Sequence, residues 1–189
     1  PEPSTEASAQ TEPEAETESE EDPTDDAKAT RIADYMSDRT FQDFPLGADI
    51  LKGLAELGYE RATPVQAATI EPGLAGKDLL VRAKTGTGKT AAFGLPIIAR
   101  SEAGSRKVNA VVLTPTRELA LQVAEEIAAI AKYKDLRICT LYGGVAIGPQ
   151  ADALEAGVEI VVGTPGRIID HLRRGTLDLS HANIVCLDE

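Results

Sequence analysis

Five short apolar runs rich in Val, Ile and Leu alternate with helix-like segments between residue 78 and the end of the chain. The runs occupy residues 78–82, 109–114, 137–142, 158–162 and 183–187 and lack a regular polar alternation. Strands of this kind are buried on both faces, which is typical of parallel sheets covered by helices on each side. The pattern therefore predicts an α/β fold with a mostly parallel sheet.

Helical spacing is clearest at residues 117–132, where four apolar residues follow one stripe: Leu119, Val123, Ile127 and Ile130. Two further helices are predicted before the first apolar run, at residues 48–57 and 65–74. Gly58 is expected to end the first of these helices, and Pro72 to disturb the second.

The N-terminal segment differs from the rest of the chain in charge. Eleven of the 31 Asp and Glu residues lie within residues 1–26, which contain no Lys or Arg. With few apolar residues to bury, residues 1–30 are predicted to be a disordered acidic tail, and residues 31–189 a single domain. The remaining 20 acidic and 19 basic residues nearly balance. A nucleic-acid partner is therefore not excluded, but its binding would depend on a few placed side chains.

Cys139 and Cys186 each lie in an apolar run without C-x-x-C spacing, which predicts buried free thiols and a reducing compartment. His171 and His181 show no metal-binding pattern and are expected to have no special role. No secretion leader or membrane-spanning run is recognisable, so we expect a cytoplasmic protein without a membrane partner. Because the chain starts at Pro1 and stops at Glu189 directly after an apolar run, we expect a fragment.

Residues 83–90 have the spacing of a phosphate-binding loop and stand between the first apolar run and a helix-like segment. Glycines allow a tight turn whose backbone N–H groups face an anion, and the following helix offers its positive end. The strict pattern begins with glycine, whereas this chain has Ala83; an ordinary glycine-rich turn is the alternative. The candidate phosphate-binding residues are Ala83, Thr85, Gly86, Thr87, Gly88, Lys89 and Thr90.

In a parallel sheet, the loops at the carboxyl ends of the strands form the ligand crevice. The last apolar run delivers Asp188 and Glu189 to this edge. Asp188 with Thr90 suits Mg²⁺, and Glu189 suits the orientation or deprotonation of an attacking water. The alternative is a solvated acidic pair.

Residues 58–66, together with Phe41, are candidates for recognition of the base. The Gln66 amide can match the N6 and N7 edge of adenine, and an aromatic ring can stack on a purine. The residues alone favour a plainer alternative, in which Gln66 is an exposed helix residue and Phe41 belongs to the core.

A series of motifs in order resembles the first RecA-like domain of the DEAD-box ATP-dependent RNA helicases. Residues 58–66 with Phe41 resemble the adenine-specific Q motif, and residues 83–90 the Walker A loop. The further matches are motif Ia at residues 115–120, the GG motif at 143–144, motif Ib at 164–167, and the start of the D-E-A-D box at 188–189.

The resemblance implies a RecA-like P-loop domain that binds ATP and Mg²⁺. It implies base contacts from Phe41, Tyr59, Arg61 and Gln66, and catalytic roles for Lys89, Asp188 and Glu189. It also implies contacts to the RNA backbone, with little sequence preference, from Pro115, Thr116, Arg117, Gly143, Gly144, Thr164, Pro165, Gly166 and Arg167.

In the family, a second RecA-like domain completes the cleft, and it is absent from these 189 residues. We therefore expect RNA unwinding or remodelling from the complete enzyme and negligible turnover from this chain alone. Two alternatives remain: a nucleotide-dependent RNA-binding module without turnover, and another P-loop helicase branch that acts on DNA.

Overall fold

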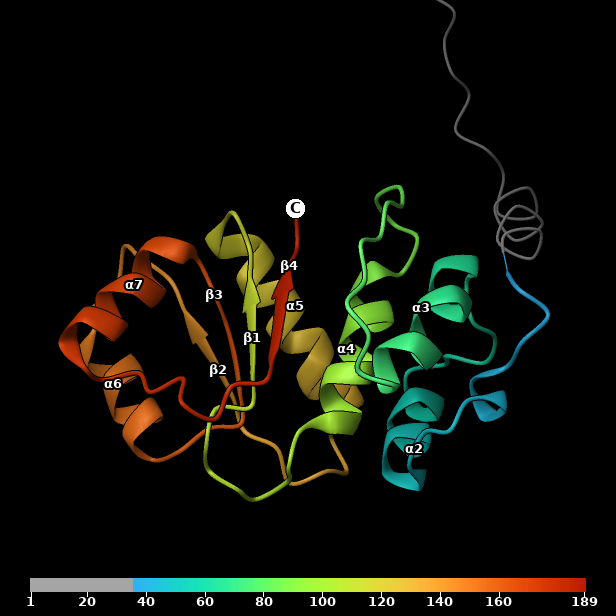
Figure 1. Cartoon of the computed structure of the whole chain (residues 1–189), viewed down its shortest axis with the longest axis horizontal. Coiled ribbons are helices and arrows are strands. Elements are labelled where there is room, and N and C mark those ends of the chain that lie inside the picture. The colour runs from blue at the N-terminus through green and yellow to red at the C-terminus, as the bar shows by residue number, and fades with distance from the viewer. Residues whose placement is uncertain (1–35) are drawn as a thin grey trace, which may run out of the picture. The chain divides into compact units, whose positions relative to one another are not determined.

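The computed structural model describes residues 36–189, so the predicted acidic tail lies outside the described residues. Helices come first in this range, and strands and helices alternate from residue 110 onward (Figure 1). In chain order the elements are η1 (Phe41–Asp43), α2 (Ala48–Glu56), α3 (Pro64–Leu74), α4 (Lys89–Arg100), β1 (Ala110–Leu113), α5 (Arg117–Ile130), β2 (Ile138–Leu141), α6 (Gly148–Glu155), β3 (Ile160–Gly163), α7 (Pro165–Arg174) and β4 (Ile184–Leu187).

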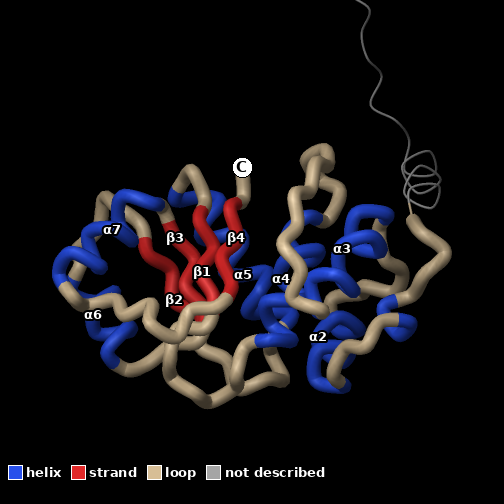
Figure 2. Tube along the Cα trace, viewed as in Figure 1, coloured by secondary structure: helices blue, strands red, loops and turns tan. Residues whose placement is uncertain are grey.

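The four strands form one parallel sheet in the order β2-β3-β1-β4 (Figure 2). The central strand β1 pairs on both sides, so that Val111 stands opposite Val161 of β3 and Val185 of β4. All carboxyl ends therefore point to one edge of the sheet. The predicted parallel α/β architecture is confirmed.

Alternate residues of the strands enter two separate hydrophobic cores. Val112 and Val162 face a larger core that also contains residues of α2, α3, α4 and α5. Val111 and Val161 point the other way and pack with Ile168 of α7 and Leu154 of α6. Helices therefore cover both faces of the sheet, as predicted from the unbroken apolar character of the strands.

The boundaries of the helices lie close to the positions that local sequence signals predict. Gly58 takes a positive φ of 74° just after α2, and Thr63 caps α3 by accepting a hydrogen bond from the backbone of Gln66. In α5, the residues Val123, Ile127 and Ile130 of the predicted stripe are fully buried. The amphipathic period thus identified the surface by which α5 packs on the sheet.

The predicted strand at residues 78–82 does not form. This segment pairs with no strand among the described residues, and its Leu80 is fully exposed. A groove of about 460 Å³ lies between the segment and β4, lined on one side by Leu79 and Val81 and on the other by Val185 and Leu187. β4 has one unpaired edge in the described sheet, but the groove separates it from residues 78–82, so this apolar run has no neighbour with which to form a strand.

The two cysteines are free thiols, as predicted. Cys139 is buried, whereas Cys186 is partly exposed beside the groove. Burial raises the pKa of Cys139 to about 11, and burial together with the charge of Asp188 raises the pKa of Cys186 to about 12. Among residues 36–189, no group of His, Cys, Asp and Glu side chains is arranged to hold a metal ion. The same residues include no helix with the length and apolar character of a membrane span.

Candidate functional site

The phosphate-binding loop ends in Gly88, which caps the N-terminus of α4 in the left-handed conformation. Gly86 and Gly88 have φ values of 78° and 81°, a region in which other residues are strained. Gly88 is also closely packed, because a Cβ atom at this position would lie 2.4 Å from Nε2 of Gln66. The second glycine of the motif is therefore required both by its backbone angle and by its neighbour.

The backbone amides of this loop have no acceptor in the described part of the chain. Gly86, Thr87, Gly88 and Lys89 donate no hydrogen bond to residues 36–189. Unpaired N–H groups at the start of a helix carry a partial positive charge and favour an anion. The loop therefore has the chemistry of a phosphate cradle.

The carbonyl side of the loop is fixed, in contrast, by side chains. Thr63 Oγ1 donates to the Thr87 carbonyl at 2.9 Å, and Gln66 Nε2 donates to the Gly88 carbonyl at 3.1 Å. Within the loop, the Thr87 hydroxyl donates to the Lys84 carbonyl at 2.8 Å. These bonds hold the carbonyls away from the cradle and leave the amides facing it.

Gln66 is neither the exposed helix residue of the plainer alternative nor, in this structure, open to a base. Only 1% of its surface is exposed, and its Oε1 accepts from the Thr63 amide at 2.9 Å while Nε2 bonds to Gly88. Its contact with adenine therefore stays a prediction. What the structure adds is a direct connection from α3 to the phosphate loop.

Phe41 differs from the stacking residue that the resemblance implies. It is 2% exposed and packs in the larger core, with its ring edge-on to Tyr59 at a centroid distance of 5.9 Å. A base cannot stack on a ring whose faces are covered, so the core alternative describes Phe41 in this structure. Tyr59 and Arg61 hold the adjoining segments together: the Tyr59 hydroxyl donates to Glu126, and Arg61 donates to the Ser37 carbonyl.

Lys89 and Glu189, which stand 100 positions apart in sequence, meet at the carboxyl edge of the sheet. The Lys89 Nζ lies 3.3 Å from Glu189 Oε1. Burial raises the pKa of the adjacent Asp188; the Lys89 charge opposes this rise and the Glu189 charge adds to it. A cation and two carboxylates thus converge on the loop with the free amides, beside Thr90 at the start of α4. This is the convergence that the sequence pattern predicted.

The predicted RNA-binding residues lie at the carboxyl ends of β1, β2 and β3, which are neighbours in the sheet. Thr116 caps α5, and the guanidinium of the next residue, Arg117, lies 4.7 Å from the ring centroid of Tyr142 after β2. Gly143 and Gly144 are exposed with nothing within 4 Å of an added Cβ. Residues 164–167 begin α7 directly after β3. The structure therefore brings the three groups to one edge.

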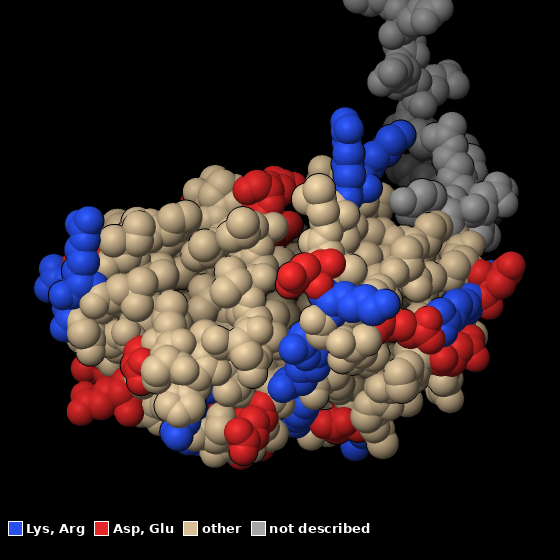
Figure 3. Space-filling view, in the orientation of Figure 1, with Lys and Arg blue, Asp and Glu red and all other residues tan. Residues whose placement is uncertain are grey.

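The charge distribution agrees with this arrangement of a few placed groups. Figure 3 shows acidic and basic side chains interspersed over one face of the molecule, without a broad basic patch. Binding of a polyanion at this edge would rest on individual arginines, hydroxyls and backbone amides.

Two buried polar residues next to this edge were missed by sequence analysis. Gln150 is 8% exposed and His171 is fully buried, and the two side chains contact one another. His171 had been expected to have no special role; the structure shows that it is buried, with its ring nitrogens 2.8 Å from Thr176 Oγ1 and 3.2 Å from Gln150 Oε1. A usable signal existed for Gln150, because it shares a helix face with the apolar residues Ala153 and Leu154.

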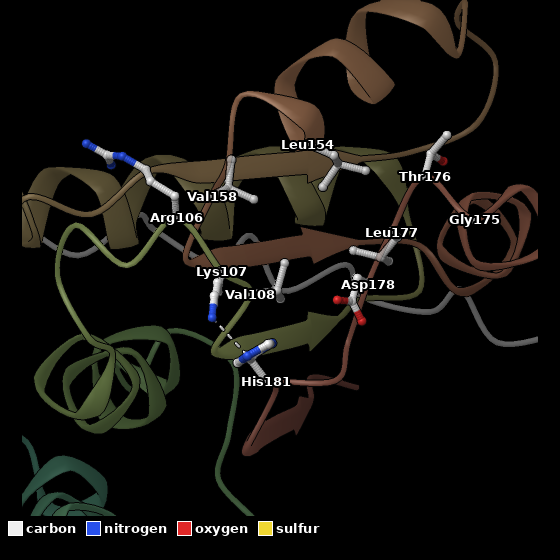
Figure 4. Close-up of a pocket in the computed structure, with 10 residues that line it drawn as sticks. All are labelled: Arg106, Lys107, Val108, Leu154, Val158, Gly175, Thr176, Leu177, Asp178 and His181. Carbon is white, nitrogen blue, oxygen red and sulfur yellow. Dashed lines mark hydrogen bonds between the residues drawn. The ribbon is translucent and has the colours of Figure 1, made fainter.

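A second hollow, of about 190 Å³, lies at the opposite, amino end of the sheet (Figure 4). It is lined by residues that precede β1, β3 and β4, among them Lys107, Val158 and His181. Lys107 points toward His181, and their nitrogens are 3.1 Å apart. This hollow lacks a glycine-rich loop and lies away from Lys89, so it does not belong to the candidate site.

Comparison with known proteins agrees with the geometry. The family model described as DEAD/DEAH box helicase matches residues 63–189. Two curated relatives named DEAD-box ATP-dependent RNA helicase CshA, from Bacillus licheniformis and Bacillus subtilis, are 50% and 48% identical over 150 residues. These matches cover 79% of this chain but only 31% and 30% of the relatives, so the chain spans about a third of their length.

Solved structures give the same result. The crystal structure of a DEAD box protein from Methanococcus jannaschii superposes with a TM-score of 0.76 at 43% identity, covering 79% of this chain and 41% of that one. A hypothetical ATP-dependent RNA helicase from Sulfolobus tokodaii superposes with a TM-score of 0.69 at 40% identity, covering 76% and 41%. From its sequence, its RecA-like fold and the geometry of its phosphate loop, the chain belongs to the DEAD/DEAH box helicase family.

Proposed function

We propose that this chain is the ATP-binding domain of an RNA-dependent ATPase that locally unwinds or remodels RNA. The observation that carries the proposal is the convergence of Lys89 with Glu189 at a loop whose amides are free. The names of the relatives support ATP and RNA as the ligands, although those names belong to proteins about three times as long.

The residues present fit ATP and Mg²⁺. The free amides of residues 86–89 and the Lys89 ammonium suit the β- and γ-phosphates, and the Thr90 hydroxyl with the Asp188 carboxylate suits the metal ion. When bound, Mg²⁺ neutralises charge on the phosphates. Glu189, which already lies beside Lys89, is placed to orient or deprotonate a water.

The RNA strand is proposed to lie across the ends of β1, β2 and β3. Arg117, Thr164 and Arg167, with the glycines at 143 and 144, offer donors to phosphates and 2′-hydroxyls. Because these groups contact the backbone, little sequence preference is expected. The interspersed charges on the surface are consistent with binding by a few placed side chains.

Efficient turnover is proposed to require a second RecA-like domain. Arginines supplied across such a cleft are worth about 10³–10⁵ in rate in phosphoryl transfer. The 189 residues studied contain one domain of this kind, so we expect them to hydrolyse ATP at a negligible rate.

The decisive experiment measures ATP turnover, with and without single-stranded RNA, on this chain and on a longer chain that carries a second RecA-like domain. RNA-stimulated turnover only in the longer chain is the expected result. Comparable turnover by the 189 residues alone would refute the role of the second domain. Binding of a nucleotide but no response to RNA in the longer chain would refute the RNA assignment.

Base recognition is tested separately by titrating ADP and GDP into the unaltered chain. We expect ADP to bind more tightly, and Gln66→Ala to reduce the difference. Equal affinities for ADP and GDP in the unaltered chain would show that the adenine role of Gln66 is wrong.

A further inference from the structure

We propose that Gln150, backed by His171, is a positioning residue that holds Arg167 and the glycine loop after β2 in one arrangement for the RNA backbone. The inference rests on the proposed function of this edge, and it concerns residues outside every motif named above. Gln150 lies in α6 and His171 in α7, so their contact joins two helices on the same face of the sheet.

The Gln150 amide contacts three residues in two segments, the loop after β2 and the helix α7. Its Oε1 accepts from Arg167 Nη1 at 2.9 Å and lies 3.2 Å from His171 Nε2, and its Nε2 donates to the Tyr142 carbonyl at 3.1 Å. Rotating the amide by 180° would set its NH₂ against the Arg167 donor and its oxygen against the Tyr142 carbonyl. Its orientation is therefore determined by its surroundings.

This orientation also determines the tautomer of His171. Because Gln150 presents an oxygen, His171 must donate from Nε2–H. The hydroxyl of Thr176 lies 2.8 Å from Nδ1 and 3.2 Å from the His171 carbonyl, and in this tautomer its single proton goes to Nδ1. The ring is fully buried, so it has no water to bond to instead. A neutral histidine with one defined tautomer thus fixes the far side of the Gln150 amide.

These contacts fix the guanidinium of Arg167 and leave some of its N–H donors without a partner among them. Nη1 donates to Gln150, and Nη2 donates to the Val145 carbonyl at 2.9 Å. A guanidinium has five N–H donors, so three remain for a phosphate. A long side chain that is already ordered does not have to lose conformational entropy when it binds its ligand. Without this ordering, binding is expected to be weaker by roughly three- to tenfold.

The same bonds hold the loop that carries Gly143 and Gly144. Gln150 fixes the carbonyl before these glycines and Arg167 fixes the carbonyl after them. The stacking of Arg117 on the Tyr142 ring continues the connection toward β1. Two glycines that would otherwise be mobile are therefore held between anchored carbonyls.

The first test measures backbone order parameters by NMR ¹⁵N relaxation on the full 189-residue chain. Gln150→Leu removes the bonds to Tyr142 and Arg167, so we expect lower order parameters in residues 143–147. Gln122→Leu, the same change at an exposed position of α5, is the matched control and should leave that segment unchanged. Unchanged order parameters in folded Gln150→Leu would overturn the proposal.

A pair of substitutions at His171 separates positioning from simple packing. His171→Gln keeps an amide donor that can reach Gln150, whereas His171→Leu fills the space without a donor. We expect lower order parameters in residues 143–147 with leucine, and values close to those of the unaltered chain with glutamine. Equal order parameters in the two variants would show that His171 only fills space.

The functional readout is the affinity for a 5′-labelled oligouridylate, measured by fluorescence anisotropy, beside the affinity for Mg·ADP. We expect Gln150→Leu to weaken RNA binding by roughly three- to tenfold and to leave Mg·ADP binding unchanged. If the order parameters of residues 143–147 fall but RNA affinity does not, the arrangement does not serve RNA and the proposal fails. If the unaltered chain itself does not bind the oligonucleotide, the RNA assignment fails, while the relaxation experiments still decide the positioning role.

Discussion

The phosphate loop and the loops after β1, β2 and β3 lie on the same edge of the sheet but are held in different ways. At the phosphate loop, Thr63 and Gln66 fix backbone carbonyls, the amides are free, and the preceding segment pairs with no described strand. At the other loops, each strand is paired with a neighbour in the sheet, and side chains fix one another through Gln150. The conformation of the phosphate loop therefore depends mainly on backbone angles, whereas that of the loops after β1, β2 and β3 depends mainly on hydrogen bonds made by side chains.

This difference predicts which substitutions each region tolerates. Where backbone conformation decides, glycine positions should be the most sensitive. Where side chains decide, polar residues far from any motif should matter, and pH should act through a buried titratable group.

The largest effect is expected from Gly88→Ala. A left-handed residue other than glycine costs roughly 1–2 kcal/mol, and overpacking against Gln66 adds roughly 1–3 kcal/mol, so we expect a loss of about 2–5 kcal/mol in the free energy of unfolding. Gly86→Ala is the control, because Gly86 also has a positive φ but has no atom within 4 Å of an added Cβ. Urea unfolding of both variants measures the difference. Equal losses would show that the contact between Gln66 and the loop is not tight.

The next effect is on ligand binding. Lys89→Ala should weaken Mg·ADP binding about 10- to 100-fold, because a charge-assisted hydrogen bond to phosphate is lost. The fold should survive, since a solvent-exposed ion pair such as Lys89–Glu189 contributes about 0–1 kcal/mol. Isothermal titration calorimetry and a thermal melt check the two statements. Lys107→Ala, at the amino end of the sheet, should leave the affinity unchanged; a large loss of stability in Lys89→Ala would contradict the assignment.

The same comparison explains how far the sequence predicted this structure. Local signals identified the strands 110–113 and 184–187 from their unbroken apolar runs, and the helix at 117–130 from its apolar period. Burial matches these signals in β1 and α5, whereas Val185 and Leu187 of β4 are exposed. The glycine and lysine spacing at residues 83–90 identified the phosphate loop because its conformation depends mainly on backbone angles. The apolar run at residues 78–82 was wrongly predicted to be a strand. Strand formation depends on a neighbouring strand, and this segment pairs with none among the described residues.

The side-chain bonds around Gln150 could not be predicted in this way. The contact of Gln150 with Arg167 joins residues of two helices that meet only in the folded domain. Gln66 was expected at a base or at the surface; its surface position is ruled out, and its bond to the Gly88 carbonyl could not be seen in the sequence. In both cases the sequence shows the polar residue, but not the residue to which it bonds in the folded domain.

A smaller effect should appear in the pH dependence of stability. Burial lowers the pKa of His171, and the Arg167 and Arg174 charges lower it further, while the Asp170 charge acts in the opposite direction. The native state therefore binds fewer protons than the unfolded state below about pH 6.5, and stability falls as the pH falls through this range. The loss cannot exceed about 1.4 kcal/mol per pH unit for one group.

Unfolding measured between pH 7.5 and 5.5 tests this expectation. His171→Gln should flatten the dependence, whereas His181→Gln, an exposed histidine, should not. Carboxylates with lowered pKa values, such as Asp178, lose their stabilising contribution at lower pH and do not account for a change in this window. An unaltered slope in His171→Gln would show that the buried ring does not govern it.

The smallest effect on folding is expected from Leu80→Lys, in the unpaired segment before the phosphate loop. Leu80 is fully exposed, so its replacement should change the free energy of unfolding by no more than about 0.5 kcal/mol. Solution behaviour should change more, because Leu80 stands beside the exposed Val185 and Leu187 of the β4 edge, and exposed apolar edges promote self-association. Sedimentation velocity should therefore show less self-association in the variant.

Leu172→Lys, at an exposed apolar position on α7 away from the groove, is the matched control. If both variants reduce association equally, net charge rather than the unpaired edge is responsible, and a substantial loss of stability in Leu80→Lys would mean that the segment packs more tightly than its exposure indicates.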